Sequence, residues 1–379
     1  MAQQNRKKIA GLYIHIPFCR SKCSYCSFYS TTSTNGVDDF LKALCHEMTL
    51  YRTSFHLFDT LYFGGGTPSL LSIKQFNNIL MRAQKTFSFT KDPEITVEIN
   101  PADMNLHDLQ SLRCMGVNRI SIGVQSFHDD VLALLGRRHT GNQARHAIED
   151  ARRAGYENIS LDLMYGIPGQ AVFSWEKTLQ EAISFAPEHL SCYELTVENN
   201  TPLGEKCRMG EFLLPDEGRQ LDLFIVTSGI LENAGYLHYE VSSFSRNKTL
   251  RSQHNSKYWS HTPYLGLGPS AHSFAENRRW WNKDSLTEYV TDVSRGTFPV
   301  ASSEILSAEA MRLEALFLGF RTNEGIHLNN FNTRFFCNLL EEKADLIKKL
   351  QNSGFVMVKD GYLRPTRSGL AVADSLSLI

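Results

Sequence analysis

The chain has 379 residues, of which 42% are hydrophobic and 21% are charged, so it is too long for a disulfide-stapled miniprotein and too apolar to be mostly disordered. Lys and Arg total 39 against 40 for Asp and Glu, a net charge of −1, which argues against a nucleic-acid-binding scaffold because such proteins are normally basic. No apolar run approaches the roughly 18 residues that span a bilayer, and the first residues are too polar for a secretory signal, so we expect a cytoplasmic protein without a transmembrane segment.

The first half of the chain alternates between short apolar runs and amphipathic stretches. Runs rich in Ile, Leu, Val and Tyr predict six strands, over 11–16, 60–63, 95–99, 119–124, 159–164 and 190–195. Helical periodicity predicts helices over 38–51, 73–84 and 143–154. Strands that alternate with helices indicate βαβ units around a parallel sheet. Six such units predict the fold class α/β, with a partial (β/α)6 TIM-like barrel over residues 1–240.

The second half of the chain has a different organisation. A helix is predicted over 216–234, and the alternation in YLHYEVSSFS (236–245) predicts a strand. A connecting segment, 241–300, carries the polar and aromatic stretch HNSKYW. The last segment, 301–379, predicts a helical domain in which FVMVKDGYLRPT forms a hairpin between two helices, which resembles a winged helix.

Three of the eight cysteines lie close together, in CRSKCSYC: Cys19, Cys23 and Cys26. A structural zinc usually takes four ligands, so zinc would need a distant fourth ligand such as His15. A [4Fe–4S] cluster normally takes four cysteines, so three leave one iron open to a substrate or cofactor. In a reducing compartment the remaining cysteines are expected to be thiols.

Polar residues follow the predicted strands at their carboxyl ends, where barrels of this kind carry their chemistry. The cysteine loop follows the first strand and Gly64–Thr67 the second, while Glu98, Gln125 and Asp162 lie at or near the ends of later strands. Consecutive glycines suit a close approach of the backbone to a ligand. A buried Glu98 carboxylate needs a partner, which could be a bound cofactor or Arg119.

The C-x3-C-x2-C spacing resembles that of the radical S-adenosylmethionine (SAM) superfamily, and YIHIPFCRSKCSYCSFYS is similar to its HemN/HemW branch. The resemblance implies a [4Fe–4S] cluster on the three cysteines and SAM on its open iron. It implies SAM contacts from one set of residues: Tyr13, Tyr25, Gly65, Gly66, Thr67, Glu98, Gln125, Arg137 and Asp162. Arg138 is an alternative to Arg137, and the two tyrosines could equally belong to the core.

Two features point to the haem-chaperone group of that branch. Phe28 stands two residues after the third cysteine, where the oxygen-independent coproporphyrinogen dehydrogenases carry another cysteine. His254 opens an H-N-x-x-Y-W signature, which makes it a candidate haem ligand; His261 and His272 are rivals, and a purely structural His–Asn pair is the alternative. Arg278–Trp281 could meet haem propionates or a partner, or could be a surface turn.

The resemblance therefore implies a haem chaperone that binds haem and passes it to an acceptor protein at a membrane face. Whether the chain is an enzyme stays open, and no catalytic residue is assigned. The alternatives are oxygen-independent coproporphyrinogen III dehydrogenase, which Phe28 disfavours, and another radical SAM enzyme acting on a tetrapyrrole. An RNA-modifying enzyme would need a basic face, so no nucleic-acid partner is expected. The sequence leaves a homodimer open.

Overall fold

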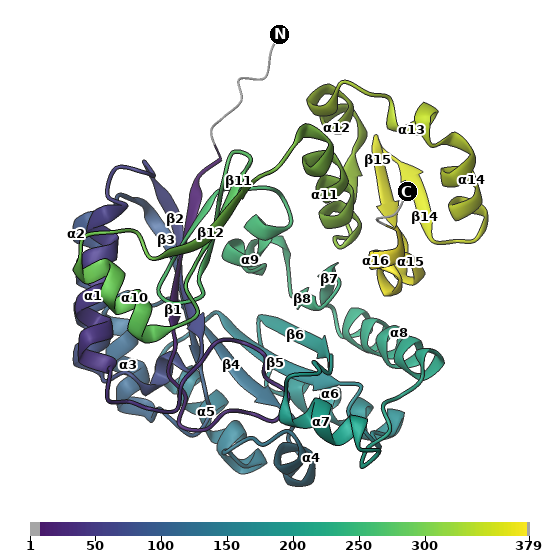
Figure 1. The fold of residues 1–379 in the computed structure, drawn as a ribbon. Coiled ribbons are helices and arrows are strands. Elements are labelled where there is room, and N and C mark those ends of the chain that lie inside the picture. Colours follow the sequence, from purple (N-terminus) through teal and green to yellow (C-terminus); the bar gives the residue numbers. More distant parts are fainter. Residues whose placement is uncertain (1–7, 377–379) are drawn as a thin grey trace. The chain divides into compact units, whose positions relative to one another are not determined.

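The computed structural model describes residues 8–376 (Figure 1), and the chain divides into two compact units. The first unit contains the chain up to residue 159, together with 200–202 and 261–305. The second contains 160–199, 203–260 and the chain from residue 306.

The first unit is built on strands in the order β12-β11-β10-β9-β1-β2-β3-β4. Strands β1 to β4 run parallel, β9 joins β1 in parallel, and β10 to β12 continue antiparallel. The strands are β1 (Ala10–Ile16), β2 (Phe58–Gly65), β3 (Phe89–Ile99), β4 (Arg119–Gln125), β9 (Tyr264–Leu267), β10 (His272–Ala275), β11 (Arg278–Asn282) and β12 (Val300–Ile305). The helices are α1 (Val37–Leu50), η1 (Pro68–Leu70), α2 (Ile73–Thr86), α3 (Leu106–Cys114), α4 (Asp129–Leu134), α5 (Gly141–Arg153) and α10 (Leu286–Ser294).

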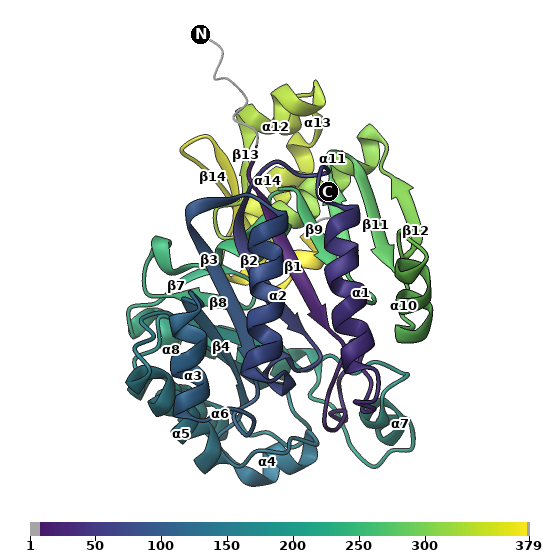
Figure 2. The ribbon, with the colours of Figure 1, turned by 90° about the vertical axis from the view of Figure 1, so that its left-hand side faces the viewer.

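Helices α1, α2 and α10 pack together on one side of this sheet (Figure 2). Helix α1 repeats apolar residues at helical spacing, and Phe40, Leu44 and Met48 are fully buried. Helix α2 begins where Ser72 and Gln75 form a reciprocal capping box, which satisfies backbone N–H groups of its first turn.

The second unit holds a strand group in the order β5-β6-β8-β7 and a separate three-stranded sheet in the order β13-β15-β14. Its strands are β5 (Ile159–Tyr165), β6 (His189–Glu194), β7 (Leu237–Glu240), β8 (Ser243–Ser245), β13 (Ile326–His327), β14 (Val356–Lys359) and β15 (Tyr362–Pro365). Its helices are α6 (Val172–Ser184), α7 (Pro202–Arg208), α8 (Glu217–Asn233), η2 (Lys248–Leu250), α9 (Gln253–Tyr258), α11 (Ala308–Phe320), α12 (Leu328–Phe335), α13 (Leu339–Glu342), α14 (Ala344–Asn352), α15 (Arg367–Ala371) and α16 (Ala373–Leu376).

The six predicted strands correspond to β1 to β6, and the predicted helices to α1, α2, α5 and α8. The predicted C-terminal hairpin is β14–β15. Its turn residues Asp360 and Gly361 both have positive φ, 52° and 78°, as the tight turns that match strand twist require. Around it, α11 to α14 contribute apolar side chains such as Leu316, Leu339 and Ile347 to a separate core.

One strand prediction is wrong. Residues 236–245 form two short antiparallel strands, β7 and β8, rather than one strand. The break falls at Val241 and Ser242, whose main-chain groups bond outside the hairpin: Val241 N–H donates to the Arg321 carbonyl at 2.9 Å, and the Ser242 carbonyl accepts from Cys192 N–H at 2.7 Å. These tertiary hydrogen bonds outweigh the local alternation, which by itself indicates a continuous strand.

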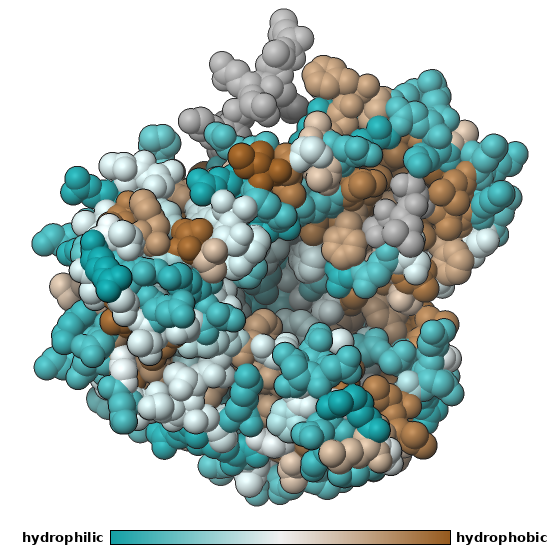
Figure 3. Space-filling view, in the orientation of Figure 1, coloured by the Kyte–Doolittle hydropathy of each residue, from teal (hydrophilic) through white to brown (hydrophobic). Residues whose placement is uncertain are grey.

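No helix within residues 8–376 is long and apolar enough to cross a bilayer. The face drawn in Figure 3 is mainly hydrophilic and carries separate hydrophobic patches.

Candidate cofactor site

The three clustered cysteines lie in the loop that follows β1, and each sulfur faces a hydrogen-bond donor. The Thr67 hydroxyl donates to Cys19 Sγ at 3.4 Å, and Arg137 Nη1 donates to Cys23 Sγ at 3.4 Å. Burial and the nearby Cys23 and Cys19 raise the pKa of Cys26, while a hydrogen bond from the main-chain N–H of Phe28 lowers it. Donors aimed at sulfur stabilise thiolates, which is the form that binds iron.

The cysteine loop is anchored at two further points. Ser24 donates to the Leu134 carbonyl through its hydroxyl at 3.0 Å and to the Leu135 carbonyl through its main-chain N–H at 3.1 Å. The buried Asp103 carboxylate binds Arg138 at 2.5 Å and Arg20 of the loop at 3.6 Å. These contacts hold the loop against the residues after β4, which is why Arg137 reaches Cys23.

The zinc alternative does not fit this geometry. Both ring nitrogens of His15 are occupied, because Nε2 bonds the Tyr29 carbonyl at 2.9 Å and Nδ1 bonds the Tyr13 hydroxyl at 3.2 Å. Burial lowers the pKa of His15 to about 4. Within residues 8–376 no three His, Cys, Asp or Glu side chains converge to hold a single metal ion. Three cysteines whose sulfurs accept hydrogen bonds, with no fourth ligand beside them, suit a [4Fe–4S] cluster with one open iron.

The glycine loop after β2 packs against this site, and side-chain atoms would not fit there. A Cβ on Gly64 would lie 3.1 Å from the Glu98 carboxylate, and one on Gly65 would lie 2.5 Å from the His15 ring. A Cβ on Gly66 would lie 2.7 Å from a carbonyl oxygen of the cysteine loop. The main-chain N–H groups of Gly66 and Thr67 donate to the carbonyls of Ile16, at the end of β1, and of Phe18, both at 2.8 Å. These two amides therefore hold the glycine loop against the start of the cysteine loop.

Side chains on the face of the sheet opposite α1 form a polar and aromatic surface, which we call the distal face: Tyr13, His15, Tyr62, Glu98, His272 and Trp281. Glu98 accepts a hydrogen bond from the Tyr62 hydroxyl at 2.7 Å. Glu98 pairs with Ser121 in the strand register, whereas Arg119 pairs with Thr96, two residues nearer the amino end. The carboxylate therefore has a hydroxyl partner and lies beside the glycine loop.

Gln125 and Arg137 carry two signs of a ligand site. Gln125 ends β4 with a φ of 62°, a strained conformation that is uncommon for a residue other than glycine. Its side-chain oxygen is buried without a hydrogen-bond partner, as is Arg137 Nε. Arg137 Nη2 donates to the Gly123 carbonyl at 2.7 Å, and among the described residues no carboxylate pairs with Arg137. A buried guanidinium without a carboxylate calls for another anion, which a thiolate-bound cluster or a SAM carboxylate would provide.

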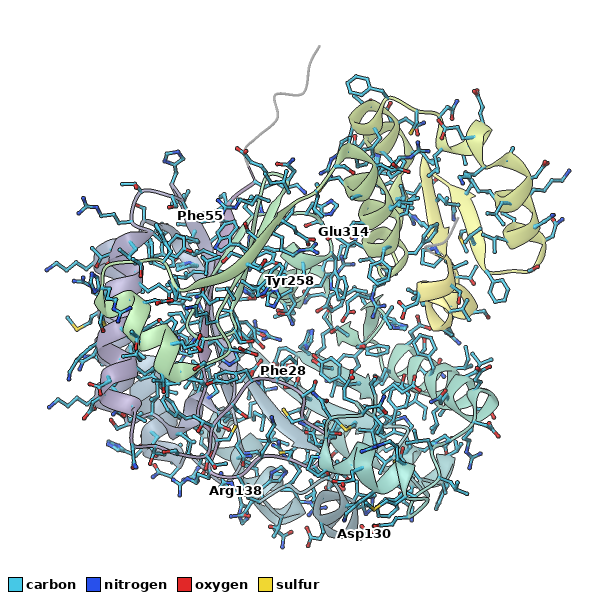
Figure 4. All side chains as sticks on the ribbon, in the orientation of Figure 1. Phe28, Phe55, Asp130, Arg138, Tyr258 and Glu314 are labelled. Atoms are coloured by element: carbon cyan, nitrogen blue, oxygen red, sulfur yellow. The ribbon has the colours of Figure 1, made fainter. Side chains whose placement is uncertain are left out.

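Arg137 and Arg138 have different partners, which favour Arg137 as the cofactor contact. Arg138, labelled in Figure 4, pairs with Asp103, whereas Arg137 faces Cys23. Tyr25 lies beside Arg137 and between Cys23 and Cys26, and burial raises its pKa, so its phenol stays protonated.

Two predicted site residues belong to the second unit, and each is described there. Asp162 is half-buried on β5 and pairs with Ser191 of β6. His254, on α9, is 1% exposed, and its Nε2 bonds the Tyr258 hydroxyl at 3.0 Å. This buried pair favours a structural role for His254 over metal binding.

The buried carboxylate of Glu47 was not anticipated. Glu47 of α1 is fully buried and accepts from the Tyr289 hydroxyl at 2.7 Å, Gly268 N–H at 2.8 Å and Asn282 Nδ2 at 2.6 Å. Its position could have revealed it, because Glu47 follows Phe40 by seven residues and so falls on the apolar face of the helix. Glu47 joins α1 to both ends of the segment that carries β10.

Comparisons with known proteins agree with this geometry. A family profile of the radical SAM superfamily matches residues 13–182, and one of the HemN C-terminal domain matches 306–372. The chain is 33% identical to the heme chaperone HemW of Bacillus subtilis, over 96% of this chain and 97% of that protein. It is 34% identical to the mitochondrial radical S-adenosyl methionine domain-containing protein 1 of Bos taurus, over 97% of this chain and 86% of that protein.

The fold is shared with a solved structure. Coproporphyrinogen III oxidase (HemN) from Escherichia coli, a radical SAM enzyme, matches with a TM-score of 0.85 at 23% identity, over 99% of this chain and 91% of that one. The predicted α/β class, with a radical SAM barrel fold and a C-terminal domain of the HemN type, is confirmed.

Proposed function

Because the chain belongs to the radical SAM superfamily and, within it, to the HemW family, we propose that it is a haem chaperone, which binds haem and transfers it to an acceptor protein. The observation that carries the proposal is the cysteine loop. Three cysteine sulfurs are each backed by a donor, and the next position of the pattern holds Phe28, whose side chain is 68% exposed (Figure 4). Phe28 supplies no further thiol, which speaks for a chaperone rather than a dehydrogenase.

In this proposal Cys19, Cys23 and Cys26 bind the [4Fe–4S] cluster, and Arg137 offsets its negative charge. When bound, the cluster supplies one-electron chemistry to SAM on the open iron. Glu98 can accept from ribose hydroxyls or an ammonium group, as it accepts from Tyr62. Gln125 offers an unpaired buried oxygen to the same ligand.

Further SAM contacts come from the remaining predicted residues. Tyr13 and Tyr25 flank the cluster loop, and the carbonyl groups of Gly65 and Gly66 suit the methionine ammonium because carbonyls accept from it. A SAM contact from Asp162, which belongs to the second unit, remains a prediction of the sequence. A cytoplasmic location, an acceptor protein at a membrane face and a homodimer remain predictions of the sequence.

Anaerobic titration of the cluster-reconstituted protein with haem tests the proposal. We expect saturation near one haem per chain, followed by transfer of haem to apomyoglobin, both read from the Soret absorbance. Cys45→Ser, a thiol outside the loop, is the matched control for Cys23→Ser in cluster content. If haem binds only nonspecifically, or is never released to the acceptor, the chaperone proposal fails.

The fold shared with HemN favours one second candidate, oxygen-independent coproporphyrinogen III dehydrogenase. It predicts oxidative decarboxylation of coproporphyrinogen III with consumption of SAM. Incubation with both compounds and a reductant, analysed by porphyrin chromatography, separates the two functions, because a chaperone yields no stoichiometric product.

A further inference from the structure

His272 places an imidazole on the distal face of the first unit. It is the first residue of β10 and pairs with Trp281 of β11. Trp280, the residue before Trp281 in β11, points toward α1, since its indole N–H donates at 3.1 Å to the hydroxyl of Tyr51 at the end of that helix. Because side chains alternate along a strand, Trp281 and His272 face away from α1. Figure 2 shows β1, β9, β11 and β12 across this sheet, with α1 in front of it.

The His272 ring is accessible and has the properties of a metal ligand. It is exposed and stacks on the Trp281 indole, with ring centroids 5.7 Å apart and planes 22° apart. Among residues 8–376 the imidazole has no hydrogen-bond partner. Burial and then Arg279 lower the pKa of His272, so the ring is neutral near neutral pH and a nitrogen lone pair is available.

Hydrogen bonds fix the backbone that carries His272. Gly268 is held by Glu47 through its N–H and by Asn282 through its carbonyl, at 2.8 and 2.9 Å. Asn282 N–H donates to the Ala271 carbonyl at 2.9 Å, next to His272. Ser270 has a φ of 60°, a conformation costly for a residue other than glycine. A buried carboxylate and a strained turn thus fix the position of an otherwise unbonded side chain.

The rival histidines are differently placed. His254 is buried and bonded to Tyr258, so iron would have to displace that hydroxyl and reach a ring that is 1% exposed. His261 is half-buried in the turn before β9 and stacks on Phe274, with ring centroids 5.6 Å apart. Of these three candidates, His272 has the exposed ring.

We propose that His272 is the axial ligand of the haem iron, and that Trp281 fixes the orientation of its ring; this inference rests on the proposed haem binding. The Arg278–Trp281 segment, which could have been a surface turn, is strand β11. Trp281 therefore lies in a regular strand, on the same face of the sheet as His272.

The surrounding residues suit a porphyrin bound at this position. His272 would hold the iron of a bound haem through a ring nitrogen, as histidine does in other haem proteins. Trp281, stacked on the imidazole, would offer an aromatic surface to the porphyrin. Arg279 lies on the same face and pairs with Glu304 at 3.2 Å. A guanidinium has five N–H donors, so Arg279 could also donate to a propionate.

The experiment compares haem with metal-free protoporphyrin IX on the reconstituted protein. We expect His272→Gly to weaken haem binding about tenfold or more and to leave protoporphyrin IX binding unchanged, because protoporphyrin IX makes no bond to the ring. Added imidazole should restore the Soret maximum in His272→Gly, as replacement of the missing ligand requires. His254→Gln should keep the wild-type haem affinity, and circular dichroism verifies the fold of both variants.

Each outcome bears on a separate claim. If the wild type fails to bind haem, the proposed function falls, and the ligand assignment with it. If the wild type binds haem and His272→Gly binds equally well, only the assignment is overturned. Equal loss of haem and protoporphyrin IX without imidazole rescue also overturns it, since the variant would then have lost a surface rather than a ligand.

Discussion

Tyr289→Phe should destabilise the protein more at about pH 8 than at about pH 5.5, because the lost hydroxyl bonds the buried Glu47 carboxyl. Burial raises the pKa of Glu47 to about 7, against the three donors that lower it. The Phe variant has the same shape, so it removes one hydrogen bond without leaving a cavity.

The magnitude follows from the charge state of Glu47. Above the folded pKa the hydroxyl bonds a carboxylate, and such a bond contributes about 2 kcal/mol; below it the bond is neutral and contributes about 1 kcal/mol. The folded pKa of Glu47 exceeds its unfolded value, so the stability gained from protonation is fully present below the unfolded pKa. It is lost as pH rises through the folded pKa. Removing a donor raises the folded pKa further, so the loss grows with pH.

Urea unfolding of the cluster-free, reduced protein at the two pH values measures this difference. Tyr156→Phe is the matched control, since that buried hydroxyl bonds the neutral Leu109 carbonyl at 3.2 Å. The control should cost about 1 kcal/mol at both pH values. Equal destabilisation of Tyr289→Phe at the two pH values, or none at either, would refute the reasoning.

Three further predictions concern the cysteine loop. Gly66→Ala would place a Cβ 2.7 Å from a loop carbonyl, so iron content after reconstitution should drop sharply, whereas Gly218→Ala in α8, with its nearest neighbour at 3.4 Å, should keep it. Arg137→Ala should weaken SAM binding about tenfold in calorimetry, and Arg138→Ala, which leaves Arg137 on Cys23, should change it by no more than about twofold; equal effects would contradict the assignment. Phe28→Ser, at a side chain that is 68% exposed, should alter the free energy of unfolding by less than about 0.5 kcal/mol, and a larger loss would mean that Phe28 packs in the fold.

Local patterns in the sequence were sufficient for much of the fold. The six strands and the helices α1, α2, α5 and α8 follow from hydrophobic periodicity, and the Asp360–Gly361 turn from residues that tolerate positive φ. The cysteine spacing and Phe28 single out the candidate cluster loop, because its three cysteines lie within eight residues of one another and need no long-range contact to be recognised.

Contacts between distant segments decided the rest. The sequence could not choose between Arg137 and Arg138, which differ only in whether they face Cys23 or Asp103. Nor could it show that His254 is buried while His272 is exposed and stacked.

The hydrogen bonds to the buried Glu47 carboxylate also depend on contacts between distant segments. Glu47 is separated by 221 residues from Gly268 and by 242 from Tyr289, and only the packed chain brings these donors to it. The sequence alone determined most of the elements and singled out the candidate cluster ligands, because the physical causes of both lie within a turn or a strand. The tertiary structure decided which polar side chains are satisfied internally and which remain available to a ligand, because a buried polar group takes its partner from wherever the fold supplies one.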